Sequence, residues 1–90
     1  MGSVLLKIKI MPVSPNIKLD EIKNKARIII EKGKGKNFKT EEEPIAFGLK
    51  ALILSFEIDE SHELEPIEED LKKIKNVSSV QVTDMRRAVG

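Results

Sequence analysis

The sequence lacks cysteine, tryptophan and tyrosine altogether, and histidine occurs once among its 90 residues. The absence of cysteine excludes disulfide bonds, thiolate catalysis and cysteine-based zinc sites. No apolar run approaches the roughly 20 residues that a membrane-spanning helix needs. The first residues also lack the basic start and apolar stretch of a signal peptide. We therefore expect a soluble, cytoplasmic protein with no membrane association.

An excess of charge of one sign is missing as well. Sixteen basic and 15 acidic side chains leave a formal net charge of +1, so no overall positive field marks a nucleic-acid-binding protein. Hydrophobic residues nevertheless make up 40% of the chain, which favours a folded globule over a disordered segment. A chain of this length suits a single domain, residues 1–90, with little room for an enclosed active-site cleft.

Apolar residues recur with a spacing of two in three segments. This spacing predicts strands over residues 3–11, 51–58 and 77–85, the first with its even positions facing the core. The charged segment 38–44 is a plausible edge strand, since Pro44 cannot donate a hydrogen bond to a neighbouring strand.

Helical spacing of apolar residues appears in two further segments. The first begins at Leu19 and ends at Gly33 and Gly35, and the second runs from Leu64 to Ile74. The predicted order is βαββαβ, that of an α+β, ferredoxin-like sandwich with two helices on one face of a four-stranded antiparallel sheet. Right-handed crossovers then place the first and third strands in the centre. The predicted core contains Ile8, Ile10, Ile22, Ile29, Leu52, Leu54, Ile67 and Leu71.

Catalytic and metal-binding constellations are not evident. His62 lies between Glu60 and Glu63 without the ligand spacing of a zinc site, so we interpret it as a solvated loop residue. Consecutive acids at 41–43 point to alternate faces of a strand and cannot converge on one substrate atom. The Lys32–Lys36 segment follows a helix instead of opening one, which favours a basic loop or a partner-steering patch over a phosphate cradle.

The open face of the predicted sheet carries Lys7, Lys9, Ala51, Ile53 and Ser55. RNA-recognition modules stack bases on paired aromatic residues at these places, and this chain has none there. A hydrolase of the acylphosphatase kind would need an arginine in the loop after the first strand, and that loop also has none. A further alternative is a small-molecule-sensing module that dimerises through this face.

Two segments of the sequence carry a family resemblance. The first is Glu43-Pro44-Ile45-Ala46-Phe47-Gly48-Leu49-Lys50-Ala51-Leu52, and the second is Val82-Thr83-Asp84-Met85-Arg86-Arg87. Together with the opening strand they resemble archaeal elongation factor 1-beta, and the resemblance covers essentially the whole chain. The first segment is more distantly similar to the Gly-Phe-Gly turn of the eukaryotic relatives.

The resemblance implies a guanine nucleotide exchange factor for the GTPase elongation factor 1-alpha. Such a protein carries out no covalent chemistry, needs no cofactor of its own and contacts no nucleic acid directly; we expect it to act as a monomer. The resemblance places partner contacts at Ala46, Phe47 and Gly48 and at the terminal Asp84, Arg86 and Arg87. An aromatic residue at a turn can also plug its own core, so Phe47 has two interpretations.

The C-terminus departs from the eukaryotic pattern. The eukaryotic relatives end in a tail whose lysine reaches toward the Mg²⁺ of the GTPase, and no lysine aligns with it here. Arg86 or Arg87 could supply the positive charge, although a planar guanidinium differs from a lysine ammonium. How the Mg²⁺ is displaced stays open at this point.

Overall fold

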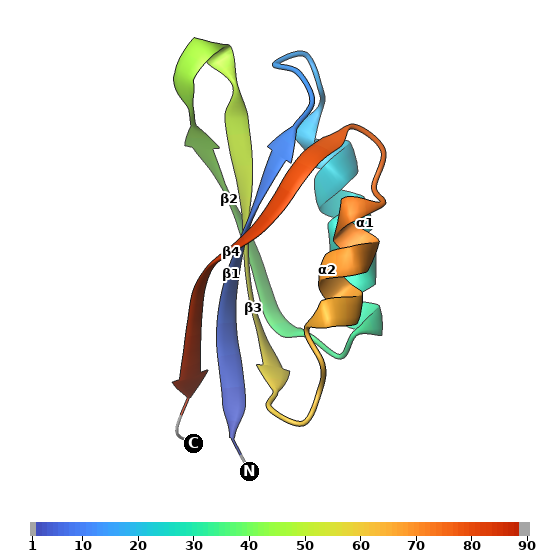
Figure 1. Cartoon of the computed structure of the whole chain (residues 1–90), viewed down its shortest axis with the longest axis vertical. Helices are drawn as coiled ribbons and strands as arrows, with labels where there is room; N and C mark the ends of the chain where they lie inside the picture. The colour runs from blue at the N-terminus through green and yellow to red at the C-terminus, as the bar shows by residue number, and fades with distance from the viewer. Residues whose placement is uncertain (1, 89–90) are drawn as a thin grey trace.

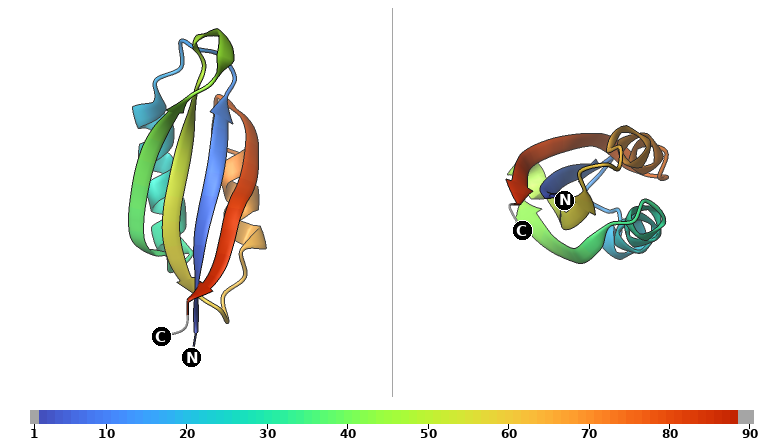
Figure 2. Two further views of the ribbon diagram at one scale, coloured as in Figure 1. Left: turned by 90° about the vertical axis from the view of Figure 1, so that its left-hand side faces the viewer. Right: turned by 90° about the horizontal axis from the view of Figure 1, so that it is seen from below.

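Four strands form one antiparallel sheet of order β2-β3-β1-β4, and two helices cover one of its faces (Figures 1 and 2). The structure is a computed structural model that describes residues 2–88. Its elements are β1 Ser3–Pro12, α1 Leu19–Lys32, β2 Lys36–Pro44, a 3₁₀ turn Ala46–Gly48, β3 Lys50–Asp59, α2 Glu65–Lys72 and β4 Val77–Ala88. The predicted βαββαβ order and the central position of β1 and β3 are confirmed. The last strand extends three residues beyond its predicted end.

The pairing of β1 with β3 determines which side chains reach the core. Their antiparallel register places Ile8 opposite Leu54, with the equivalent pairs Leu6–Phe56 and Ile10–Leu52 on either side. Because alternate residues of a strand point to opposite faces, all of these even-numbered side chains face the helices. The odd-numbered side chains of both strands face away from the helices, on the open face of the sheet.

The core lies between the sheet and the two helices. Seven of the eight predicted core residues are buried, and Ile29 is half-buried at the margin of the cluster. Leu6, Ala26, Ile30, Phe56, Ile58 and Ile74 complete the buried cluster. From the helices, Ile22, Ala26 and Ile30 of α1 and Ile67 and Leu71 of α2 contribute to it.

The end of α1 differs in detail from the expected glycine stop. The Gly35 N–H donates to the Ile30 carbonyl at 2.8 Å and the Lys34 N–H donates to the Glu31 carbonyl at 3.0 Å, the pattern of a Schellman motif. The residue in the left-handed region is Lys34, with φ of 69°, and not a glycine. Gly35 is required for a close approach, since a Cβ there would meet the side chain of Ile30 and lie 3.0 Å from its carbonyl oxygen.

Register irregularities interrupt both edge strands, two along β4 and one along β2. On β4, Val82 pairs with Ile8 and Asp84 pairs with Lys7, which leaves Thr83 as the extra residue. On β2, Lys36 pairs with Glu57 and Lys39 pairs with Ser55, so that strand too has one residue more than its partner. Bulges increase the local twist of a sheet. Both edges curl toward the open face, and the end-on view shows a strongly curved sheet (Figure 2).

Truncating Leu54 to alanine is expected to lower the free energy of unfolding by about 2–5 kcal/mol, because it leaves a cavity at a fully buried position. Urea-induced unfolding followed by circular dichroism measures this loss. Ile28→Ala is the matched control, since Ile28 lies on α1 with its side chain exposed, and it should change stability by less than about 0.5 kcal/mol. A tolerant Leu54→Ala variant would contradict this core.

Candidate functional site

The β2–β3 hairpin ends in a tight turn, Ala46–Gly48, at one end of the molecule (Figure 1). Phe47 is the middle residue of this turn. The Leu49 N–H donates to the Ala46 carbonyl at 3.3 Å and closes the turn, and the Ile45 N–H donates to the Leu49 carbonyl at 2.7 Å behind it. The two central residues, Phe47 and Gly48, have φ of 62° and 76°. Positive φ at both central positions is the mark of a type I′ hairpin turn.

Phe47 is 94% exposed, so its ring contributes nothing to the core. The interpretation of Phe47 as a plug for the core is therefore wrong. A left-handed backbone is unfavourable for a bulky side chain, and type I′ turns usually have asparagine, aspartate or glycine at this position. The fold thus holds a large apolar side chain in water on a strained backbone, a combination that stability alone would not favour.

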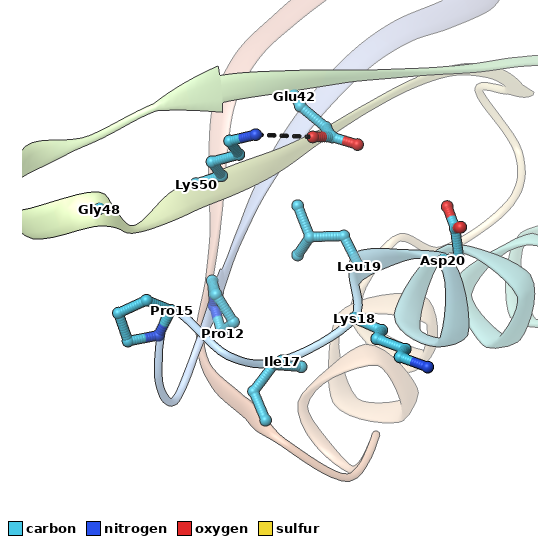
Figure 3. A pocket seen from close by; sticks show the side chains of 9 residues that line it. All are labelled: Pro12, Pro15, Ile17, Lys18, Leu19, Asp20, Glu42, Gly48 and Lys50. Carbon is cyan, nitrogen blue, oxygen red and sulfur yellow. Dashed lines mark ion pairs between the residues drawn. The ribbon is translucent and has the colours of Figure 1, made fainter.

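A small pocket lies next to this turn, between the hairpin and the loop that connects β1 to α1 (Figure 3). Its volume is about 290 Å³. Pro12, Pro15, Ile17 and Leu19 provide apolar contacts, and Lys18, Asp20, Glu42, Lys50 and the backbone of Gly48 complete the lining. The Lys50 Nζ and a Glu42 carboxylate oxygen lie 3.9 Å apart, and both side chains are more than half exposed, so this ion pair contributes little stability.

The C-terminal candidates lie on β4 near its end. Beyond the bulge at Thr83, Asp84 and Arg86 pair with Lys7 and Leu5, two open-face residues of β1. The Arg86 Nε lies 3.1 Å from a carboxylate oxygen of Asp84. Asp84 and Arg86 therefore sit together on the open face.

Arg87 has a different environment from Arg86. It pairs with Val4 in the strand register, and its Nε lies 3.3 Å from a carboxylate oxygen of Glu60, in the loop after β3. Both arginine side chains are about three-quarters exposed. Their ion pairs are therefore weak and can be exchanged for contacts to another molecule.

The structure brings the six candidates together in two groups rather than one. Ala46, Phe47 and Gly48 form the turn before Lys50, whereas Asp84, Arg86 and Arg87 lie on β4 near Ser3 and Asp59. Lys50 and Asp59 are the two ends of β3, about 30 Å apart at the usual rise of a strand. The groups occupy opposite ends of a molecule whose longest dimension is 42 Å.

Sequence reasoning missed a set of polar residues on the open face. Ser3 Oγ donates a short hydrogen bond to one Glu57 carboxylate oxygen, and Asn37 Nδ2 donates to the other at 3.0 Å. The hydrogen bond from Ser3 has the larger effect on Glu57 and that from Asn37 the smaller. Both lower the pKa of Glu57 because they stabilise its charged form. The only signal in the sequence is Asn37 itself, a residue type that tolerates the left-handed φ of 55° found at this bulge.

The remaining chemical candidates lie at the end of β3 and in the loop that follows it. His62 is exposed, and its backbone N–H donates to the Asp59 carbonyl at 2.9 Å. Hydrogen bonds from the backbone and the hydroxyl of Ser61 lower the pKa of Asp59, which marks a local turn. Within residues 2–88, no three or more histidine, aspartate or glutamate side chains cluster as a metal site would require. In the same residues, no helix has the length and apolar character to span a membrane.

Comparison with known proteins places the chain in a family. Residues 5–88 match the family described as the EF-1 guanine nucleotide exchange domain. The chain belongs to this family. It is similar to elongation factor 1-beta of Methanosarcina barkeri, with 47% identity over 88 residues that cover 97% of this chain and 99% of the relative.

Other archaeal relatives match over nearly their whole length as well. Elongation factor 1-beta of Methanobrevibacter smithii is 42% identical over 88 residues, covering 97% of this chain and 98% of the relative. That of Methanococcus maripaludis is 33% identical over 86 residues, covering 94% and 97%. The predicted resemblance is confirmed. Of the two segments that carried it, Glu43–Leu52 forms the end of β2, the Phe47 turn and the start of β3, and Val82–Arg87 lies in β4.

Substitutions of Phe47 test whether this residue lowers the free energy of unfolding relative to a residue that suits the turn. Phe47→Ala should leave the free energy of unfolding within about 0.5 kcal/mol of the wild type, because the ring has no packing to lose. Phe47→Asn should raise it by about 0.5–2 kcal/mol, since Asn-Gly suits a type I′ turn. Urea unfolding measures both, and a loss of several kcal/mol in either variant would show that the ring packs against the fold.

The Glu57 network predicts a defined pH dependence. A lowered pKa in the folded state means that the carboxylate stabilises the fold above the ordinary glutamate pKa, and that this contribution is lost as the pH falls through the lowered value. Ser3→Ala should raise the pKa of Glu57 toward its ordinary value, and Asn37→Ala should raise it less. Carbon-detected NMR titration of the Glu57 carboxyl measures this, and an unchanged pKa in Ser3→Ala would contradict the network.

Proposed function

We propose that this protein is a guanine nucleotide exchange factor that promotes the replacement of GDP by GTP on elongation factor 1-alpha during translation elongation. Membership of the exchange-domain family supports the class of activity. The observation in the structure that carries the proposal is Phe47, an exposed apolar side chain on a conformationally costly turn. A side chain of this kind is explained by a partner that buries it.

The mechanism follows from coupled binding and involves no covalent step. A partner that binds the nucleotide-free GTPase more tightly than the GDP-bound form must weaken GDP affinity by the same factor. Phe47 serves as an apolar anchor, and Ala46 and Gly48 allow the backbone of the turn to approach the GTPase closely, because neither has a large side chain. The protein itself needs no nucleophile, base or cofactor for this task.

The separation of the two candidate groups supports a contact at two places on the GTPase. The turn at Phe47 lies at one end of β3, and Asp84, Arg86 and Arg87 lie near the other. An antiparallel sheet four strands wide keeps the distance between these ends fixed. Binding at both ends would then favour the GTPase conformation in which the two contacted surfaces have the same spacing as the two ends of the factor. The conformation that binds GDP would have a different spacing and would not bind the factor at both ends.

At the C-terminal end, Arg86 and Arg87 supply the positive charge that competes with Mg²⁺ for the phosphates. Both guanidinium groups are about three-quarters exposed and their ion pairs are weak, so they are available to a new partner. We further propose that the protein acts as a monomer and as a single domain over residues 1–90, in the cytoplasm. Its partner in this proposal is the GTPase and not a nucleic acid.

Release of fluorescent GDP from an archaeal elongation factor 1-alpha, followed by stopped flow, tests the function. Substoichiometric amounts of the wild-type protein should accelerate release without hydrolysing nucleotide. Phe47→Ala should slow exchange at least tenfold, about 1.4 kcal/mol of lost coupling, with little change in melting temperature. Ile28→Ala removes an exposed apolar side chain from the helical layer and should exchange like the wild type.

The arginines require a separate measurement. Arg86→Ala and Arg87→Ala should slow exchange most at high Mg²⁺ concentration, where the ion competes best with a protein cation. A release rate that is unaffected by the wild-type protein at every protein and Mg²⁺ concentration would disprove the exchange function. Normal exchange by Phe47→Ala would instead remove only this residue from the contact.

A further inference from the structure

We infer that the curved open face of the sheet is a docking surface for an acidic segment of the GTPase; this inference rests on the proposed function. The two edge strands curl toward each other at the bulges of β2 and β4, and together with β1 and β3 they enclose a trough of about 470 Å³. Asn37 of β2 and Asp84 and Arg86 of β4 line the same trough, although their strands are the two outer strands of the sheet.

The charges in the trough do not cancel. Five charged side chains line it, three basic and two acidic: Lys7, Lys39, Arg86, Glu57 and Asp84. Glu57 accepts hydrogen bonds from Ser3 and Asn37, and Asp84 is paired with Arg86. Neither Lys7 nor Lys39 forms an ion pair with an acid among residues 2–88. The charge that remains for a partner is therefore positive.

The two lysines lie in one row across the sheet. Ser55 of β3 pairs with Lys7 of β1 on one side and with Lys39 of β2 on the other. Strands are about 4.8 Å apart, so the two lysine backbones are about 10 Å apart with a short side chain between them. Two flexible ammonium groups can then converge above Ser55 on a carboxylate, which accepts hydrogen bonds at both oxygens.

Other features of the trough favour a protein segment over a nucleic acid. Leu5, 45% exposed, provides an apolar contact beside the lysines, and the trough contains no aromatic side chain that faces outward for base stacking. Glu57 and Asp84 would repel a continuous phosphate backbone. They are compatible with a segment that carries one or two carboxylates among other side chains. Asp84 and Arg86 line the trough, so it is continuous with the C-terminal contact proposed above.

Reversing both lysine charges tests the inference. In the GDP-release assay at low salt, Lys7→Glu/Lys39→Glu should raise the half-saturating concentration of exchange factor at least tenfold. Added salt should also raise this concentration less in the variant than in the wild type. The variant has lost the charge–charge attraction that salt screens. The matched control is Lys25→Glu/Arg27→Glu on α1, which makes the same change in net charge on the helical layer and should differ from the wild type less than threefold.

A second variant guards against loss of folding. Lys7→Glu places an acid opposite Asp84 and could destabilise the sheet, so Lys7→Gln/Lys39→Gln is measured beside it, with thermal unfolding of each variant. The neutral pair should raise the half-saturating concentration in the same direction but less. Wild-type values for both lysine variants, or an equal loss in the α1 control, would overturn the inference.

A GTPase-independent arm separates this inference from the proposed function. A blocked oligoglutamate peptide is titrated into the isotope-labelled wild-type protein, with an oligoglutamine peptide as the neutral control and an oligouridylate as the nucleic-acid probe. Oligoglutamate should shift the amide signals of Lys7, Lys39 and Ser55, and Lys7→Gln/Lys39→Gln should abolish the shifts. If the wild-type protein does not accelerate GDP release from the GTPase, the proposed function is wrong. The shifts with oligoglutamate would then still support a docking surface for an acidic ligand. Stronger shifts with oligouridylate, or none with oligoglutamate, would overturn the docking surface.

Discussion

The even-to-even register between β1 and β3 is the constraint on which the rest of this structure depends. It pairs Ile8 with Leu54 and keeps the apolar residues of both central strands on the face that the helices cover. A slip of one residue would turn Lys7 and Lys9 into the core and expose the isoleucines, because side chains alternate strictly along a strand. The same register places Lys7 beside Ser55 on the other face, so one pairing determines both the core and the surface opposite it.

Curvature is the second determinant, and β-bulges in the two edge strands contribute to it. The extra residues at the bulges of β2 and β4 bend the edges of the sheet toward its open face. The bulge at Thr83 also changes which face the following residues occupy. Val80 and Val82 pack against the core, whereas Asp84 and Arg86, which continue the same alternation in the sequence, line the open face. One additional residue therefore moves two charged side chains from the core side to the surface where they can meet a partner.

The Phe47 turn departs from the preferences that stabilise the rest of the fold. Most of the chain follows the rule that apolar side chains are buried and charged ones are exposed, with no buried charged residue in the part of the chain that the structure describes. Phe47 breaks this rule on a backbone that suits asparagine or glycine better. The core, which the hairpin joins through Leu52 and Leu54 of β3, provides the stability that such a position requires. The residue that departs from these preferences is thus the one that the proposed function uses as a contact.

By itself, the sequence determined the number, type and order of the elements, because apolar spacing reports directly on which face of a strand or helix is buried. It also determined the central strands and seven of the eight predicted buried core residues, and the family through the Glu43–Leu52 and Val82–Arg87 segments. Only the tertiary structure decided that Phe47 is exposed and that Asp84 and Arg86 join Lys7 and Lys39 in one trough. These features depend on the turn conformation and on bulges that bring together residues distant in the chain, and neither of them leaves a periodic pattern in the sequence.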